Sequence, residues 1–200
     1  MTSRSARDLK VIPDFRRLAL SLMIGASLFG SPSLANPDEP AVLDVYSWDE
    51  EAGYWHDSDL DWFGPYATNN IVLTGDVRID ECRVSEDWGS GFRFRLTDGD
   101  MAVVIGVSCY RDNSALVIDT LLMKDAPGSE PIDSDYIDVE AALGVRHPFT
   151  MSVTPEKELI FSLGGETIRM PYKFQPTRIQ AFGFCSKGEA RLIARDALIG

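Results

Sequence analysis

The chain has 200 residues and is strongly acidic, with 31 Asp and Glu against 19 Lys and Arg and a formal net charge of −12 at pH 7. A protein of this charge is repelled by phosphate backbones and anionic lipid surfaces, which excludes nucleic acid as an expected partner. The length suits one domain of ordinary size after an N-terminal signal.

Residues 1–35 have the three-part pattern of a secretory signal peptide. A basic stretch precedes the apolar run Leu18–Phe29, and Ser33-Leu-Ala35 then supplies small residues where a signal peptidase reads them. The run is shorter than the roughly 20 residues that span a bilayer, which favours a cleaved signal over the alternative of an uncleaved anchor helix. We expect cleavage before Asn36 and a periplasmic or secreted protein without stable membrane insertion. Cleavage would leave 29 acidic and 14 basic side chains, a net charge of −15.

After residue 70 the sequence alternates repeatedly between apolar and polar side chains, as half-buried β-strands do. In residues 91–96, three apolar side chains alternate with Arg93 and Arg95. Asp98-Gly99 and Gly164-Gly165 favour tight hairpin turns between such strands. The other alternating or β-prone stretches are Ile71–Ile79, Met101–Tyr110, Ala115–Leu122, Phe149–Val153, Leu159–Leu163, Thr167–Met170, Ile179–Phe184 and Ala190–Arg195. The sequence therefore predicts an all-β fold, an antiparallel β-sandwich over residues 67–200.

Residues 36–66 differ from the rest because they are rich in acidic and aromatic side chains and lack regular alternation. We expect an edge strand over Val42–Tyr46, followed by an ordered loop that covers the sandwich.

Three cysteines, Cys82, Cys109 and Cys185, allow one disulfide outside the cytoplasm. Cys109 lies in the apolar alternation of its strand, which favours a buried free thiol. Cys82 and Cys185 each lie where a strand gives way to a polar loop, so they are the favoured pair, although spacing does not fix connectivity. No Cys-x-x-Cys motif or Cys/His cluster supports redox catalysis or structural zinc.

Four of the predicted strand segments occur in an order that is typical of a known fold. They are the long strand Ile71–Ile79 followed by Gly89–Arg95, the hairpin Phe149–Gly165, the strand Phe182–Phe184 and the closing strand Ala190–Arg195. Together they resemble the concanavalin A-like (laminin-G-like) jelly-roll superfamily of lectins and glycanases. The resemblance implies a jelly roll that binds sugar on one sheet face, and it covers most of the mature chain. It concerns the fold and does not define an activity.

The implied sugar site needs aromatic rings for apolar sugar faces and planar polar groups for hydroxyls. The candidate ligand-binding residues are Trp48, Trp55, Trp62 and Trp88 for the rings, and Arg78, Arg93 and Arg95 for the polar groups. The three arginines would form one platform if the strand of Arg78 neighbours that of the other two. The structural alternatives are tryptophans that pin the N-terminal segment onto the sandwich and arginines paired with acids on a solvated face.

Metal and catalytic motifs are incomplete. Asp57-Ser-Asp-Leu-Asp61 begins like an EF-hand loop, but Trp62 stands where glycine is required, so we expect no cofactor and keep a looser calcium site as the alternative. One glycanase branch of the superfamily carries Glu-x-Asp-x-Glu on a strand. Here Tyr136-Ile-Asp-Val-Glu140 lacks the first acid, and we expect this segment in a loop or short helix. No Gly-x-Ser-x-Gly elbow is present, and no catalytic residue is predicted.

The leading hypothesis is therefore an exported module that binds a carbohydrate or envelope polymer without catalysis. Two alternatives stay open. One is a glycan-processing hydrolase or lyase of the concanavalin A-like fold. The other is a structural or protein-interaction domain of the cell envelope whose strand edges meet a partner.

Overall fold

The computed structural model describes residues 41–58, 60, 62–64, 70–83, 89–109, 115–126 and 128–197, and β-strands dominate them. The strands are β1 (Asp44–Asp49), β2 (Trp55–Ser58), β3 (Ile71–Cys82), β4 (Gly91–Thr97), β5 (Met101–Cys109), β6 (Leu116–Lys124), β7 (Pro131–Asp138), β8 (His147–Val153), β9 (Glu158–Leu163), β10 (Glu166–Pro171), β11 (Arg178–Phe184) and β12 (Ser186–Ala197). The predicted all-β class is confirmed. Within these ranges no helix has the length and apolar character needed to cross a membrane.

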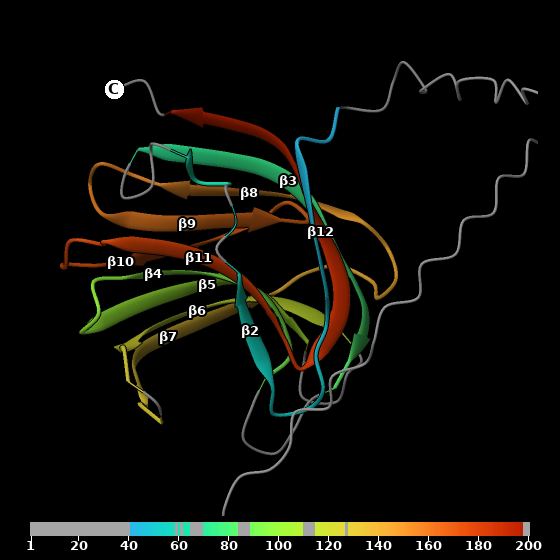
Figure 1. Cartoon of the computed structure of the whole chain (residues 1–200), viewed down its shortest axis with the longest axis horizontal. Helices are drawn as coiled ribbons and strands as arrows, with labels where there is room; N and C mark the ends of the chain where they lie inside the picture. The colour runs from blue at the N-terminus through green and yellow to red at the C-terminus, as the bar shows by residue number, and fades with distance from the viewer. Residues whose placement is uncertain are drawn as a thin grey trace, which may run out of the picture. The chain divides into compact units, whose positions relative to one another are not determined.

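The strands form two antiparallel sheets of six strands each (Figure 1). Sheet A has the order β1-β12-β3-β8-β9-β10, and sheet B has the order β2-β11-β4-β5-β6-β7. Each strand presents alternate residues to opposite sides, so the inner faces of the two sheets enclose one apolar core. The predicted antiparallel β-sandwich is therefore confirmed.

Aromatic rings join the two sheets at the centre of this core. Phe92 and Phe94 come from β4 in sheet B, and Phe149 and Phe161 come from β8 and β9 in sheet A. The ring centroid of Phe94 lies 5.2 Å from that of Phe92, 5.7 Å from that of Phe149 and 6.2 Å from that of Phe161. These contacts fix the spacing of the sheets and point Arg93 and Arg95, which alternate with the two phenylalanines, to the outer face of sheet B.

The β4–β5 hairpin has the turn that its Asp-Gly pair predicts. Gly99 adopts a φ of +98°, and Asp98 N donates to Met101 O over 3.2 Å. The Asp98 carboxylate accepts hydrogen bonds from backbone amides of the same turn, and these bonds lower its pKa below the usual value. Gly164 and Gly165 likewise both have positive φ angles in the β9–β10 hairpin.

The aromatic N-terminal segment supplies an edge strand to each sheet. β1 pairs with β12 in sheet A, two to three residues later in the sequence than predicted, and β2 pairs with β11 in sheet B. The chain thus passes from one sheet to the other between β1 and β2 (Figure 1). Tyr46 and Trp48 are buried in the core as a result, and the segment closes the two sheets at one edge.

Candidate ligand-binding face

The outer face of sheet B carries an ion pair between Arg93 on β4 and Asp119 on β6. Arg93 Nε donates to Asp119 Oδ1 over 3.0 Å, and Arg93 Nη2 donates to Asp119 Oδ2. Strand β5 lies between the two residues and carries Gly106 at this level of the register. A Cβ at Gly106 would lie 3.1 Å from Arg93 Cγ and closer still to the backbone of β4. The glycine therefore lets the arginine side chain cross β5 and reach the carboxylate.

Two further contacts hold this ion pair in place. Ser108 Oγ donates to Asp119 Oδ2 over 3.0 Å, and Arg93 Cζ lies 4.6 Å from the centroid of the Phe184 ring. A guanidinium that is stacked on a ring and bonded through two nitrogens keeps one orientation. Because Arg93 uses Nε and Nη2 on Asp119, its Nη1 is available to a ligand: within the described part of the chain it makes no hydrogen bond.

A second ion pair lies along the same face, between Arg95 on β4 and Asp125, which follows β6. Thr97 Oγ1 also donates to Asp125, and it accepts a hydrogen bond of 2.9 Å from Gly99 N in the hairpin turn. Within the described part of the chain, each of the two arginines is thus paired with an aspartate. The two pairs together add no net charge to the face, so they suit uncharged polar groups such as hydroxyls.

An exposed aromatic ring stands beside the first ion pair. Tyr136 on the edge strand β7 is the direct register partner of Asp119, so both side chains project to the outer face of sheet B. Tyr136 is 62% exposed. A solvent-exposed ring next to a fixed carboxylate and guanidinium combines the two kinds of contact that a sugar ring needs. The expectation that residues 136–140 form a loop or short helix is wrong for the first three of them, because residues 136–138 belong to β7.

Gln180 on β11 is the register partner of Arg95 and so belongs to the same face. Its side chain is fully buried, and among the described residues neither Gln180 Oε1 nor Gln180 Nε2 has a hydrogen-bond partner. An unpaired buried amide is uncommon, because most buried polar groups in native proteins are hydrogen-bonded.

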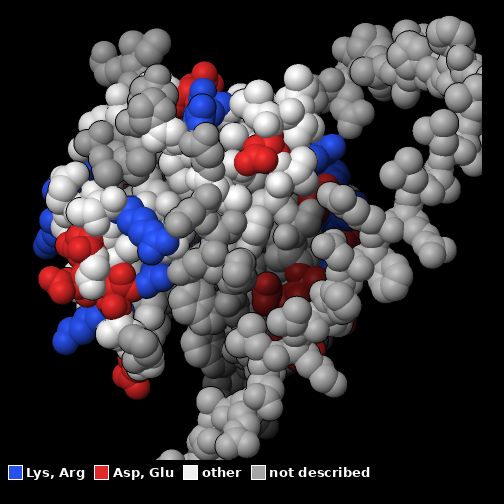
Figure 2. Space-filling model, viewed as in Figure 1, with Lys and Arg blue, Asp and Glu red and all other residues white. Residues whose placement is uncertain are grey.

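The structure separates Arg78 from the other two predicted arginines. Arg78 lies on β3 in sheet A, whereas Arg93 and Arg95 lie on β4 in sheet B, so the predicted platform of three arginines does not form. Arg78 Nη2 donates to Asp80 Oδ2 over 3.2 Å on its own strand. Figure 2 shows the same tendency on the visible surface, where basic and acidic side chains lie beside one another. Arg78 therefore fits the structural alternative, in which an arginine is paired with an acid on a solvated strand face.

The tryptophans that the structure describes in full lie inside the sandwich. Trp48 is 5% exposed and Trp62 has no exposed surface. Their indole nitrogens bond to the chain itself, Trp48 Nε1 to Ser186 Oγ over 2.7 Å and Trp62 Nε1 to Asp44 Oδ2 over 2.8 Å. Neither ring can stack on a sugar in this arrangement, so the ligand-binding interpretation of these two residues is corrected to a structural one.

Three other predicted features fall outside the described residues in whole or in part. Trp88 lies outside them, and Trp55 is described only as part of the backbone of β2. The candidate calcium segment Asp57–Asp61 also includes positions outside the described ranges. Among the described residues, no group of three or more His, Cys, Asp and Glu side chains is arranged to hold a metal ion.

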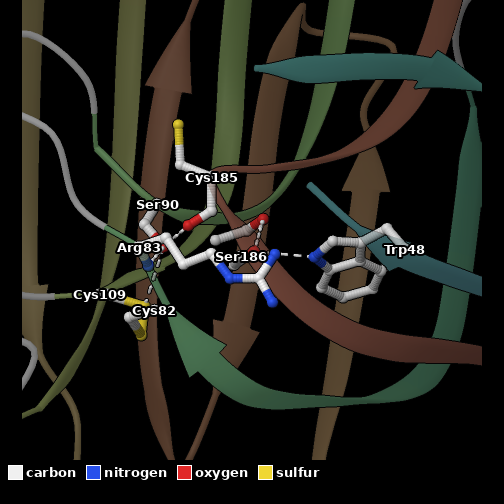
Figure 3. Close-up of a disulfide and its surroundings, with 8 residues drawn as sticks. Trp48, Cys82, Arg83, Ser90, Cys109, Cys185 and Ser186 are labelled. Carbon is white, nitrogen blue, oxygen red and sulfur yellow. Dashed lines mark hydrogen bonds between the residues drawn. A yellow bond between two sulfur atoms is a disulfide. The ribbon is translucent and has the colours of Figure 1, made fainter. Parts of the chain in front are cut away.

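The disulfide joins Cys82 to Cys109, so the predicted Cys82–Cys185 pair is wrong (Figure 3). The bond links the end of β3 in sheet A to the end of β5 in sheet B, with the two Cα atoms 6.2 Å apart. Cys185 is a buried free thiol in the short turn between β11 and β12, with a φ of +45°. In this turn its Sγ points away from the disulfide and accepts a hydrogen bond of 3.2 Å from Gly53 N.

Arg83, the residue after Cys82, borders an open hollow of about 630 Å³ that is also lined by Asp49, Glu51 and Ala52. Arg83 Nη1 lies 2.7 Å from Asp49 Oδ1, and Arg83 Nη2 donates to Glu81 Oε2 over 2.9 Å. These hydrogen bonds lower the pKa of the Asp49 and Glu81 carboxyls. The guanidinium is engaged by the protein itself, so this hollow offers a ligand less than the outer face of sheet B does.

Asp119, Asp125 and Gln180 are the functional candidates that the sequence prediction missed. Asp119 is flanked at the neighbouring outward positions of β6 by Val117 and Leu121, and Gln180 lies between the apolar residues Ile179 and Ala181 on β11. That isolation is the signal that could have identified them, since a lone polar side chain in a buried strand requires a partner.

No protein-family model matches the chain, and no curated protein matches it. Among solved structures, a galectin of Caenorhabditis elegans is 12% identical with a TM-score of 0.42, and covers 68% of this chain and 89% of its own. A carbohydrate-binding module of Bacillus subtilis is 8% identical with a TM-score of 0.48, over 78% of this chain and 97% of its own. A toad ovary galectin, solved with N-acetylgalactose, is 12% identical with a TM-score of 0.44, over 64% and 90%. All three likenesses are distant.

Proposed function

We propose that the protein binds a carbohydrate, or another hydroxyl-rich envelope polymer, on the outer face of sheet B and does not cleave it. The observation that carries the proposal is the exposed Tyr136 ring directly beside Asp119, whose carboxylate is fixed by Arg93. The ring offers a surface for the C–H face of a sugar, and the ion pair offers an acceptor and a donor for adjacent hydroxyls.

Binding without cleavage is proposed because the two carboxylates nearest to the arginines of this face, Asp119 and Asp125, are both engaged by an arginine. Glycoside hydrolysis uses one carboxyl group as an acid and a second as a base or nucleophile. Here Asp119 is paired with Arg93, and Asp125 is paired with Arg95. Both acids therefore serve as fixed hydrogen-bond acceptors in this proposal, and hydrolysis of a bound oligosaccharide would contradict it.

A glycan array that covers neutral and acidic glycans, together with purified envelope polysaccharides, tests the proposal. We expect Tyr136→Ala to weaken binding of a positive glycan about tenfold, because ring stacking contributes up to about 1.5 kcal/mol. Isothermal titration against that glycan provides the measurement. Tyr136 is exposed, so its replacement should leave the thermal stability unchanged.

Tyr54→Ala is the matched control, because Tyr54 is 64% exposed and precedes β2, away from β7. It should bind like the unaltered protein. The proposal would be contradicted if no glycan on the array bound the protein, or if Tyr136→Ala and Tyr54→Ala weakened glycan binding equally.

We also propose that the protein is exported and processed before Asn36. The disulfide between the two sheets supports this proposal, because such bonds persist mainly in oxidising compartments. When the full chain is expressed in a bacterial host, N-terminal sequencing of the periplasmic fraction is expected to start at Asn36. Recovery only from the cytoplasm with Met1 retained would contradict export.

A further inference from the structure

Gln180 has a polar side chain whose hydrogen-bonding groups are unused. Its neighbours on β11, Ile179 and Ala181, face the core, and Gln180 faces the opposite side together with Arg95. The side chain is nevertheless fully buried, and within the described ranges neither its amide oxygen nor its amide nitrogen has a hydrogen-bond partner. Each unpaired atom lowers the stability of the folded state, because it has lost its hydrogen bonds to water.

The polar groups next to Gln180 are committed elsewhere. Arg95, directly opposite on β4, forms its ion pair with Asp125. The Thr97 hydroxyl donates to the same carboxylate and accepts from the hairpin turn. These neighbours in the described part of the chain therefore leave the amide unsatisfied. An apolar side chain of the same length would suit a sheet that already carries the buried apolar cluster of Val104, Phe182 and Phe184.

We propose that Gln180 recognises the ligand on the outer face of sheet B through hydrogen bonds of its side-chain amide. A primary amide presents one acceptor and one donor side by side, so it pairs best with a ligand group that donates and accepts at neighbouring atoms. An acetamido group and a pair of adjacent hydroxyls share this chemistry. The inference rests on the proposed function, and it defines which groups of the glycan are recognised on the β11 side of Arg95.

Contact with the ligand requires a movement, because Gln180 has no exposed surface in the free protein. Arg95 is its direct cross-strand neighbour and is partly exposed, so its long side chain can turn aside at the surface. In this proposal the ligand group replaces Arg95 beside the amide and satisfies the two unpaired atoms. The stability that the unpaired amide costs the free protein is then recovered on binding.

Fragment titration followed by nuclear magnetic resonance tests this inference without a known glycan. Acetamide and ethylene glycol are added separately to the isotope-labelled protein, and the side-chain amide signals of Gln180 are observed. We expect a saturable shift of these signals with at least one fragment. A response to acetamide alone identifies an acetamido group, and a response to ethylene glycol alone identifies hydroxyls. Gln180 signals that respond to neither fragment would overturn the inference.

Gln180→Met separates a recognition role from a packing role. We expect the melting temperature of this variant to rise by about 3 °C, because the unpaired amide is gone. In the unaltered protein a bound fragment that displaces Arg95 should also shift the Arg95 Nε signal, and we expect this shift to disappear in Gln180→Met. The control is Thr120→Val, which removes a fully buried hydroxyl that is satisfied by Val104 O at 3.0 Å. It should lower the melting temperature and keep the fragment response.

An Arg95 shift that persists in Gln180→Met would contradict a role of Gln180 in recognition. If the fragments shift Gln180 but the glycan array stays silent, the proposed glycan function fails while the recognition site stands. The two failures are therefore distinguishable.

Discussion

Replacing Cys82 and Cys109 together with alanine is expected to lower the free energy of unfolding by about 3.5 kcal/mol. The disulfide closes a loop between residues separated by 27 positions in the sequence, and it joins a strand of sheet A to a strand of sheet B. Without it the unfolded chain gains the conformational freedom of that loop, which for a loop of this length corresponds to the stated magnitude. Urea unfolding at neutral pH of the unaltered protein and the double variant provides the measurement.

Cys185→Ser is the control for this experiment, because the serine hydroxyl would keep a polar atom near Gly53 N and leave the disulfide intact. We expect a clearly smaller loss of stability than in the double alanine variant. Thiol counting under denaturing conditions should find one free thiol in the unaltered protein and none in Cys185→Ser. A loss of the disulfide in the serine variant would show that Cys185, and not Cys109, is the partner of Cys82.

The wrong pairing prediction has a local structural cause. The backbone of Cys185 does lie near Cys82 in the folded protein, because its neighbour Ser186 is the cross-strand register partner of Cys82. However, the turn between β11 and β12 places Cys185 in the left-handed region, and its side chain points away from the disulfide (Figure 3). Its Sγ accepts a hydrogen bond from Gly53 N. Backbone conformation at a single turn residue decides the pairing, and sequence spacing carries no information about it.

The strands that the sequence predicts well are those with one buried and one solvated face. β4 and β8 alternate between buried and partly exposed residues, and the polar–apolar alternation of their sequences follows directly. β7 was missed because it is an edge strand with exposed residues on both sides, except for the half-buried Ile137. A strand without a buried face leaves no period of two in the sequence.

The same reasoning explains which parts of the candidate site the sequence revealed. Arg93 and Arg95 were identified as outward residues of β4 because their strand alternates. The grouping with Arg78 failed because alternation assigns a side chain to a face but does not assign a strand to a sheet. In the sequence, Tyr136 stands out only because it occupies the position where the glycanase motif has its first acid. Its place beside Asp119 follows from the register of β6 and β7, which depends on tertiary structure.

The burial of Trp48 also depends on residues that are distant in the sequence. Its ring lies against Gly183 on β11 and Gly188 on β12, where the absence of side chains makes room for an indole. Composition shows that residues 36–66 are aromatic, but two glycines near the other end of the chain decide that this ring faces the core. The interpretation of tryptophans as sugar-binding platforms could not be tested without that information.

Trp48→Ala is expected to lower the free energy of unfolding by about 3–5 kcal/mol, the usual cost of truncating a buried aromatic side chain. The ring is stacked between Tyr46 and Phe92, with centroid distances of 5.5 Å and 5.2 Å. Its Nε1 bonds to Ser186 Oγ, so the variant leaves both a cavity and a hydroxyl without this donor. Urea unfolding followed by far-ultraviolet circular dichroism measures the loss.

Gly183→Ala tests whether the contact with β11 accounts for this sensitivity. An alanine Cβ at position 183 would lie 2.1 Å from Trp48 Cγ, so the single variant is expected to lose about 1–3 kcal/mol of stability through overpacking. In Trp48→Ala/Gly183→Ala the new methyl group enters the space that the indole leaves, and the combined loss should be smaller than the sum of the two single losses. Strictly additive losses would mean that the indole does not pack on Gly183, and the closure of the two sheets by β1 would need another explanation.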